Sequence, residues 1–289
     1  MQYQGTVIRP PSEADSIILQ VTVGCSHNKC TFCRAYKGKR FQIKDDTTVD
    51  EDLAFAARHC RRLNRVFLAD GDVLIIPHAR LASLFKRIID KLPWIRRISL
   101  YANAKSIMTK SPSELRALKS LGLDRVYMGL ESGHDPTLAA IHKGADSRMM
   151  IAAALRIREA SLFLSVTVLL GIGGKENSLP HAEATGRVLT AMAPNQIAAL
   201  TLMLLKNTPL YRDATAGLFQ LSGHRQLLRE LKAMVTRIEL DRVQFQANHA
   251  SNYLPINARL SRDKARILTL IDHALAGDIK LTPEKMRAL

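Results

Sequence analysis

The sequence predicts an α/β fold: a partial barrel of six strand–helix units, followed by a C-terminal helical extension. Apolar runs of strand length alternate with amphipathic stretches of helical length over about three-quarters of the chain. The 289 residues are 47% hydrophobic, which is enough for a large core. No dinucleotide-type glycine-rich turn follows the first strand, which favours a TIM-like (β/α)6 barrel over a nicotinamide-binding fold.

The elements follow one another in a regular order. Apolar runs predict six strands, at 16–23, 65–70, 97–102, 124–130, 162–170 and 196–205. Helices are predicted between them at 48–63, 77–92, 112–122, 136–160 and 180–192. Capping boxes at Thr48-Val-Asp-Glu51 and Ser111-Pro-Ser-Glu114 indicate two of the helix starts.

The pattern changes after Leu210. Two further helices, at 223–240 and 262–276, flank the segment 245–256. We therefore expect the barrel to comprise residues 1–211, and residues 212–289 to form a helical extension packed on it rather than a separate domain.

Composition restricts the cellular setting. The N-terminus is polar and lacks the apolar core of a signal peptide, and the longest apolar stretch, 162–172, is too short to cross a membrane. Of the four cysteines, three are clustered, which is not the pattern of a disulfide framework. Reduced thiols in an α/β protein of this size favour the cytoplasm and predict no membrane partner.

The net charge of +16, from 42 Lys and Arg against 26 Asp and Glu, leaves two interpretations open. Many of the basic residues lie at 58–65 and 86–91, where they are expected on helix surfaces and strand entries. The favoured interpretation is therefore a solvated basic surface. The other is an anionic partner, for which RNA is possible but disfavoured.

The most informative feature is a loop that places Cys25, Cys30 and Cys33 directly after the first strand. Thiolates gathered on one loop bind soft metals, and three ligands leave one coordination position open for chemistry. These three cysteines are the predicted metal ligands. The alternative adds His27 as a fourth ligand, which would make a closed zinc site in a non-catalytic, nucleic-acid-binding protein.

The loop, with the aromatic Phe32 before its last cysteine, resembles the cluster loop of the radical S-adenosylmethionine superfamily. The first gap holds four residues instead of the usual three, and the second gap of two is the usual one. The resemblance implies a [4Fe–4S] cluster on the three cysteines and S-adenosylmethionine (SAM) on the fourth iron. It further implies reductive cleavage of SAM to a 5′-deoxyadenosyl radical, which abstracts hydrogen from a substrate that the sequence does not identify.

The resemblance also implies SAM-binding residues at the ends of successive strands. Ala69-Asp70-Gly71-Asp72 stands where the family carries a Gly-Gly-Glu-like turn, and Gly129-Leu-Glu131-Ser-Gly133 is similar to the family's Gly-x-Glu-Ser element. The implied cofactor-binding residues are Phe32, Gly71, Asp72, Asn103, Glu131, Gly171, Gly174 and Leu205. For Asn103 a turn role, and for Leu205 ordinary core packing, are equally open.

The segment after residue 247 is the candidate for substrate recognition, because it is a dense run of hydrogen-bonding groups. The candidate residues are Asn248, His249, Asn252 and Tyr253. The alternative is a polar turn that caps the last helices. The implied partners are a small or medium substrate, for which an anion is one option, and an external electron donor such as flavodoxin or ferredoxin.

Overall fold

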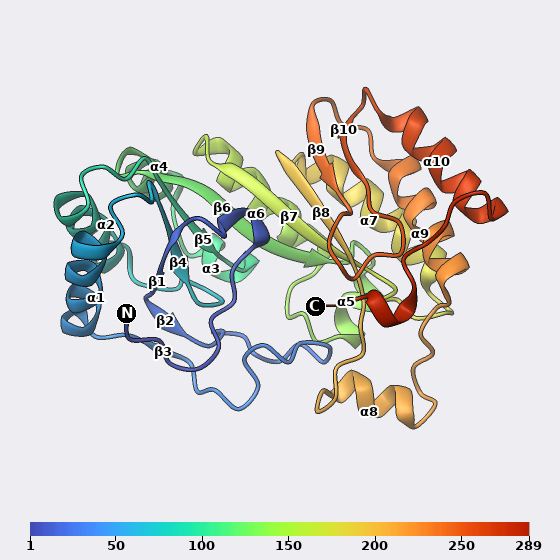
Figure 1. Cartoon of the computed structure of the whole chain (residues 1–289), viewed down its shortest axis with the longest axis horizontal. Helices are drawn as coiled ribbons and strands as arrows, with labels where there is room; N and C mark the ends of the chain where they lie inside the picture. Colours follow the sequence, from blue (N-terminus) through green and yellow to red (C-terminus); the bar gives the residue numbers. More distant parts are fainter. Residues whose placement is uncertain (289) are drawn as a thin grey trace. The chain divides into compact units, whose positions relative to one another are not determined.

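The computed structural model describes residues 1–288, and it confirms the predicted α/β class. The larger sheet has eight strands in the order β1-β4-β5-β6-β7-β8-β9-β10, and a small second sheet pairs β2 (Thr22–Val23) with β3 (Gln42–Ile43). The chain divides into two compact units. Figure 1 labels the elements of both.

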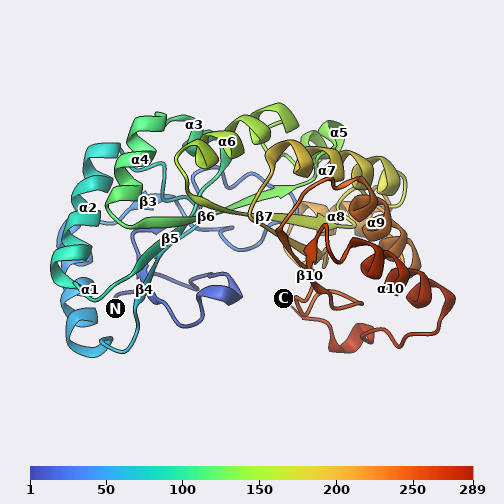
Figure 2. The same cartoon turned by 90° about the horizontal axis from the view of Figure 1, so that it is seen from above.

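The first unit comprises residues 1–28, 35–128 and 155–164. Its parallel strands are β1 (Ile17–Gln20), β4 (Arg65–Ala69), β5 (Arg97–Tyr101) and the first part of β6 (Leu123–Glu131). Its helices are α1 (Asp46–His59), α2 (His78–Lys91), α3 (Ala104–Met108) and α4 (Pro112–Ser120), after a short 3-10 turn at Pro11–Glu13. In Figure 2, α1, α2 and α4 lie on one face of β4 and β5.

An aromatic cluster lies on the other side of these strands. Phe67 of β4 makes edge contacts with Tyr101 and Tyr127, at 5.1 and 6.0 Å between ring centroids. The Tyr127 hydroxyl donates to the buried carboxylate of Glu13 at 2.6 Å, and the Arg97 guanidinium lies 3.0 Å from it. The N-terminal turn is thus held against the strands by one buried acid.

The second unit comprises residues 29–34 and 129–154 and the chain from 165 onward. Its sheet portion holds β7 (Phe163–Leu170), β8 (Gln196–Thr201) and β9 (Val243–Gln246), all parallel, and the antiparallel strand β10 (Asn257–Leu260). Its helices are α5 (Asp135–Ala140), the first part of α6 (Ser147–Glu159), α7 (Ser178–Met192), α8 (Pro209–Thr215), α9 (His224–Arg237) and α10 (Lys264–Ala276), with a 3-10 turn at Glu284–Met286.

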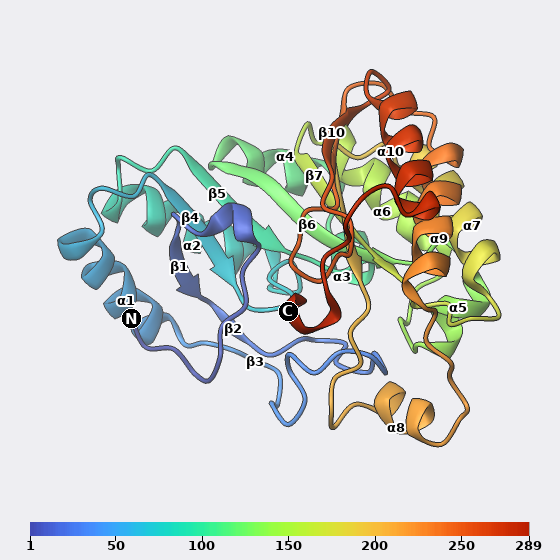
Figure 3. The same ribbon diagram turned by 45° about the vertical axis from the view of Figure 1, so that its right-hand side comes forward.

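Helices α7 and α9 run side by side in Figures 1 and 3, and a glycine sets their spacing. A Cβ on Gly186 of α7 would lie 2.6 Å from both the Arg237 Cβ and the Met234 carbonyl oxygen of α9. Real Cβ atoms do not approach backbone that closely, so the two helices pack at this distance because residue 186 has no side chain.

Several predicted boundaries need correction. The strand predicted at 16–23 is divided into β1 and β2, and the strand predicted at 196–205 ends at Thr201. The capping box at 111–114 is present, but α1 begins two residues before the predicted start at Thr48. Its N-cap is Asp45, which has extended backbone angles and accepts from the Thr48 amide at 2.8 Å. The same helix ends at His59, with Cys60 as its C-cap.

The C-terminal segment contributes strands as well as helices. Residues 243–246 alternate between buried and half-buried, which is the period of two that a strand requires. They extend the parallel ladder from β8, with Ile197 opposite Phe245. The extension was predicted as helical because these strands have only four residues each, too few to stand out as apolar runs. The 211/212 boundary itself remains a prediction.

No helix within residues 1–288 is both long enough and apolar enough to cross a membrane.

Candidate functional site

The first half of the cysteine loop is pinned to the turn after β4. Gly71 donates its amide hydrogen to the Gly24 carbonyl at 3.1 Å. A Cβ on Gly71 would lie 2.7 Å from the Tyr36 ring and 3.2 Å from the Cys25 Cβ. Glycine is therefore required at 71, because the turn passes directly against the residue that carries the first thiol.

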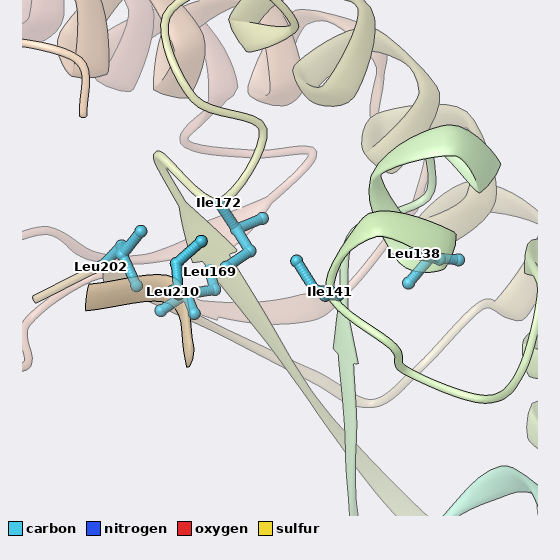
Figure 4. Packing of buried hydrophobic residues seen from close by; sticks show 6 residues of the cluster. All are labelled: Leu138, Ile141, Leu169, Ile172, Leu202 and Leu210. Atoms are coloured by element: carbon cyan, nitrogen blue, oxygen red, sulfur yellow. The ribbon is translucent and has the colours of Figure 1, made fainter. Parts of the chain in front are cut away.

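The second half of the loop is anchored within the second unit. The Thr31 amide donates to the Ile141 carbonyl at 3.0 Å, and the Leu210 amide donates to the Thr31 carbonyl at 3.0 Å. Phe32 packs against a buried apolar cluster, which Figure 4 shows as Leu138, Ile141, Leu169, Ile172, Leu202 and Leu210. Cys30 and Cys33 thus lie on either side of a half-buried aromatic ring that packs against this cluster. None of the chain's four cysteines is in a disulfide bond.

The Asp72 side chain is fully buried and surrounded by donors. It accepts hydrogen bonds from the hydroxyls of Ser26 and Ser106 and, at 2.7 Å, from the Asn103 side-chain amide. Burial raises the pKa of Asp72, and the hydrogen bonds oppose that shift. Asp72 therefore ties Ser26, in the cysteine loop, to the start of α3.

Asn103 is the N-cap of α3, since its side-chain oxygen accepts from the Ser106 amide at 2.9 Å. Its amide nitrogen donates to Asp72 and to the Ser26 hydroxyl. The turn role that the sequence left open is thus present. A contact of Asn103 with SAM stays a prediction.

Glu131 ends β6 with a left-handed backbone, at a φ of 63°. Its side chain is 13% exposed, and its carboxylate lies 3.0 Å from the Lys143 ammonium. A Cβ on Gly129 would collide with this carboxylate, so the glycine two residues earlier leaves the room that the acid occupies. Lys143 gives Glu131 a partner of opposite charge that no sequence motif indicates.

The glycine segment after β7 is covered by the chain itself. Gly171 and Gly174 have φ values of 85° and 66°. A Cβ on Gly171 would lie 2.9 Å from the Leu227 side chain, and one on Gly174 would lie 3.1 Å from Phe219. Both glycines are thus explained by a turn and by close packing, while an adenine contact stays a prediction. Leu205 is half-buried, and its carbonyl accepts from the Thr208 hydroxyl at 2.7 Å.

Two of the candidate substrate residues are held by the fold. Asn252 is buried, accepts from the Thr201 hydroxyl at 2.8 Å and donates to the Ala199 carbonyl at 2.9 Å, so it fastens its segment to β8. The Tyr253 hydroxyl bonds to Glu284, and its ring lies under the Arg287 guanidinium, 4.1 Å from the ring centroid.

His249 and Asn248 are placed differently. Asn248 is exposed and His249 is half-buried. The Ser251 amide donates to the His249 Nδ1 at 3.1 Å, so the neutral ring carries its proton on Nε2. Burial lowers the pKa of His249, which favours that neutral ring at pH 7.

The zinc alternative finds no support. Among residues 1–288, no three side chains of His, Cys, Asp or Glu converge on a point that would hold one metal ion, and this includes the three loop cysteines, so the family match given below decides between zinc and a cluster. A part of the basic charge also has a local explanation. On α2, Arg80 and Arg87 pair with Asp46 at 3.3 and 3.0 Å, and Lys91 pairs with Asp50 at 3.3 Å.

The family model described as the Radical SAM superfamily matches residues 19–182, which is more than half of the chain. The chain belongs to the Radical SAM superfamily. The matched span contains the three cysteines, the turn after β4 and the Glu131 strand end. Its members are enzymes that use a [4Fe–4S] cluster and SAM, and this confirms the resemblance and the cofactors that it implied.

Solved structures confirm the partial TIM-like barrel fold. Coproporphyrinogen III oxidase (HemN) from Escherichia coli has 14% identity and a TM-score of 0.56, covering 76% of this chain and 51% of its own. Methylornithine synthase (PylB) has 12% identity and a TM-score of 0.54, with 93% and 83% covered. The cobalamin-dependent SAM radical enzyme OxsB has 16% identity and a TM-score of 0.52, with 76% and 40% covered.

The chain thus spans less than half the length of OxsB and about half that of HemN. No curated protein matches it.

Proposed function

We propose that this chain is a radical SAM enzyme in which Cys25, Cys30 and Cys33 hold the [4Fe–4S] cluster and leave one iron open to SAM. A cluster held by these thiolates would supply the one electron that breaks the S–C5′ bond of SAM, giving methionine and a 5′-deoxyadenosyl radical that would take a hydrogen atom from the substrate. The observation that carries the proposal is the set of three thiols, none in a disulfide bond, inside a family match of residues 19–182.

The residues around the loop fit this cluster. Thiolate is the ligand that iron–sulfur clusters use, and the chain offers three thiolates at a strand end. Gly71 lets the turn after β4 pass directly against Cys25, because a Cβ at residue 71 would lie 3.2 Å from the Cys25 Cβ. Phe32 and the two Thr31 backbone hydrogen bonds fix the other half of the loop before any ligand binds. Each half of the loop is therefore held within its own unit.

We assign the SAM ligand to the predicted residues at the strand ends. Glu131 is the acid best suited to a hydroxyl or ammonium group, because it is partly exposed and only one cation opposes it. Asp72 receives donors from three side chains of its own unit, so we assign it the role of holding the loop and Asn103 in place. Gly171, Gly174 and Leu205 remain the proposed adenine wall.

For the substrate we assign contact first to His249 and Asn248, since Asn252 and Tyr253 hold their segment to the fold. A neutral imidazole with its proton on Nε2 donates one hydrogen bond, which suits a carboxylate or carbonyl oxygen. An anionic small molecule also matches the net charge of +16. For the electron donor, we propose an acidic carrier of the flavodoxin or ferredoxin kind, and for the compartment the reducing cytoplasm.

The test is anaerobic reconstitution with iron and sulfide, then incubation with SAM and dithionite. We expect a brown protein with about four irons per chain that forms 5′-deoxyadenosine without added substrate. Cys30→Ala should lose both properties. The matched control is Cys60→Ala, because Cys60 caps α1 outside the loop and should keep both.

Two results would overturn the proposal. One is a Cys30→Ala protein that cleaves SAM as fast as the unsubstituted chain. The other is a colourless reconstituted protein that retains a single tightly bound zinc ion, which would restore the zinc alternative.

A further inference from the structure

A buried series of polar groups joins two of the segments that the proposed function assigns to SAM. Ser132, directly after Glu131, lies at one end, and Gly171 lies at the other. Between them stand His181 of α7 and Glu230 of α9. The exposed fractions of Ser132, His181 and Glu230 are 0%, 1% and 0%. No step of the proposed reaction uses these three side chains.

Glu230 fixes the glycine end of this network. Its carboxylate accepts the Gly171 amide hydrogen at 2.6 Å and the Ser178 hydroxyl at 2.7 Å, and it lies 3.3 Å from the His181 Nε2. A buried carboxylate is tolerated when several donors surround it. Here one of those donors is the backbone of the glycine turn, so the direction of that amide depends on Glu230.

His181 fixes the end near Glu131. Because Nε2 faces a carboxylate, the neutral ring keeps its proton there, and Nδ1 accepts from the Ser132 hydroxyl at 2.7 Å. The Ser132 oxygen in turn accepts from the His134 amide at 3.0 Å. Beside it, the Gly133 amide donates to the Thr185 hydroxyl of α7 at 2.8 Å.

Helix α7 is also in close contact with both the turn after Glu131 and the glycine segment after β7. A Cβ on Gly133 would lie 2.7 Å from the Thr185 Cα, and a Cβ on Gly173 would lie 2.9 Å from the His181 Cβ. A shift of α7 would therefore displace both the turn after Glu131 and the glycine segment.

A serine, a histidine and a glutamate in a row also occur in nucleophilic hydrolases. Burial excludes that role for Ser132, because a nucleophile has to reach its substrate. The network joins two backbone segments and meets no solvent.

We infer that Glu230 and His181 are positioning residues that set the Gly171 turn and the Glu131–Ser132 turn together, and that the affinity for SAM depends on them. This inference rests on the proposed function. It gives α9 a part in the cofactor site, although Glu230 is 59 residues beyond Gly171.

The test compares Glu230→Gln with Glu239→Gln, a matched control at an exposed acid just after the same helix. In the chain without cofactors, amide hydrogen exchange should accelerate in Glu230→Gln within 169–174 and 131–135, while β1 and β4 keep their protection. In the reconstituted chain, the Kd for SAM should rise about tenfold to a hundredfold, the range expected for the loss of one hydrogen bond to a charged group. Iron content and the cleavage rate at saturating SAM should stay unchanged.

A folded Glu230→Gln with the unsubstituted chain's Kd for SAM would overturn the inference. Faster exchange throughout the second unit would also overturn it, because it would mean that Glu230 only stabilises the fold. If Glu230→Gln does not fold, Ser178→Ala removes one donor to the same carboxylate and should raise the Kd about three- to tenfold; an unchanged Kd there would again refute the inference.

A failure of the proposed function is separable from a failure of this inference. In that case the unsubstituted chain would neither bind nor cleave SAM. The exchange coupling between 131–135 and 169–174 would still be measurable without cofactors and would decide the positioning role by itself.

Discussion

Glu131 and Asp72 are the two carboxylates for which the family resemblance implies a contact with SAM, and they differ in what surrounds them. Asp72 accepts hydrogen bonds from three side chains in a site closed to solvent, whereas Glu131 has Lys143 as its cation and keeps some exposure. An acid with one partner can exchange or share that partner with a ligand at small cost. We therefore expect substitution of Glu131, and not of Asp72, to act directly on the affinity for SAM.

Glu131→Gln should weaken SAM binding about tenfold or more, because a hydrogen bond to a charged group contributes about 1.5–3 kcal/mol. Iron content should not change, since the three thiols are untouched. Equilibrium dialysis of SAM against the reconstituted protein measures the effect. The control is Glu159→Gln, an exposed acid that pairs with Arg116 on the surface. Equal affinities for Glu131→Gln and the control would contradict the assignment.

Glu13 carries a prediction about pH. Burial by itself would raise the pKa of Glu13. A larger, opposite effect comes from the hydrogen bonds of Ser16 and Tyr127 and the charge of Arg97, so the pKa lies below the usual 4.5. A lowered pKa means that the stabilisation is complete above about pH 5 and fades as the pH falls below 4.5.

Glu13→Gln should accordingly lower the free energy of unfolding by about 2–3 kcal/mol at neutral pH and by less near pH 3.5. Urea unfolding at the two pH values measures the difference. Asp15→Asn serves as the control, because the Asp15 side chain is 83% exposed. A loss that is the same at both pH values would mean that the Glu13 charge contributes nothing.

At the scale of elements, the alternation of strands and helices from 65 to 201 could be predicted, since each apolar run was long enough to be read by its period. The cap of α1 could not, because Asp45, Asp46 and Thr48 all suit a cap and only the backbone angles decide among them. Strands β9 and β10 could not be predicted, because four residues are too few to show a strand pattern in the sequence.

The site divides in the same way. The cysteines and the strand-end residues Gly71, Asp72 and Glu131 could be proposed from sequence, because short motifs after apolar runs carry the resemblance to the superfamily, and their roles stay predictions. Their partners could not. Lys143 lies 12 residues from Glu131, and His181 lies 49 residues from Ser132. Such pairs are brought together only by tertiary packing.

The α7–α9 interface carries a prediction of its own. Gly186→Ala should lower the free energy of unfolding by about 1–2 kcal/mol, since overpacking against backbone exceeds the gain of about 1 kcal/mol from alanine's helix propensity. Thermal unfolding measures the effect. Gly223→Ser is the control, because no atom lies within 4 Å of a Cβ there and serine favours that N-cap position. A stabilised Gly186→Ala protein would show that the helices have room to separate.

At the scale of the molecule, the C-terminal segment is part of the second unit's core. It supplies β9, which pairs with β8, and α9, which covers α7 and carries Glu230. A unit without these elements would expose the edge of β8 and leave the Gly171 amide and His181 without their acceptor.

A chain ending at residue 211 should therefore lack a cooperative unfolding transition in its second unit. Calorimetry of the shortened and full-length chains, together with amide hydrogen exchange of residues 165–201, measures whether the transition is lost. Full protection of 165–201 in the shortened chain would show instead that residues 212–289 are an independent addition to a barrel that folds alone.

The outermost strand of the second unit has a further consequence. β10 ends the strand order, and the Arg259 amide in it donates to the Asp263 carboxylate at 2.8 Å. The Arg262 guanidinium lies on the same carboxylate and, by its hydrogen bond, holds the pKa of Asp263 well below the usual value. The Arg259 amide hydrogen on this edge strand is thus already bonded to a side chain of the same chain. It is not available to a strand of another molecule, which disfavours self-association along the edge of β10.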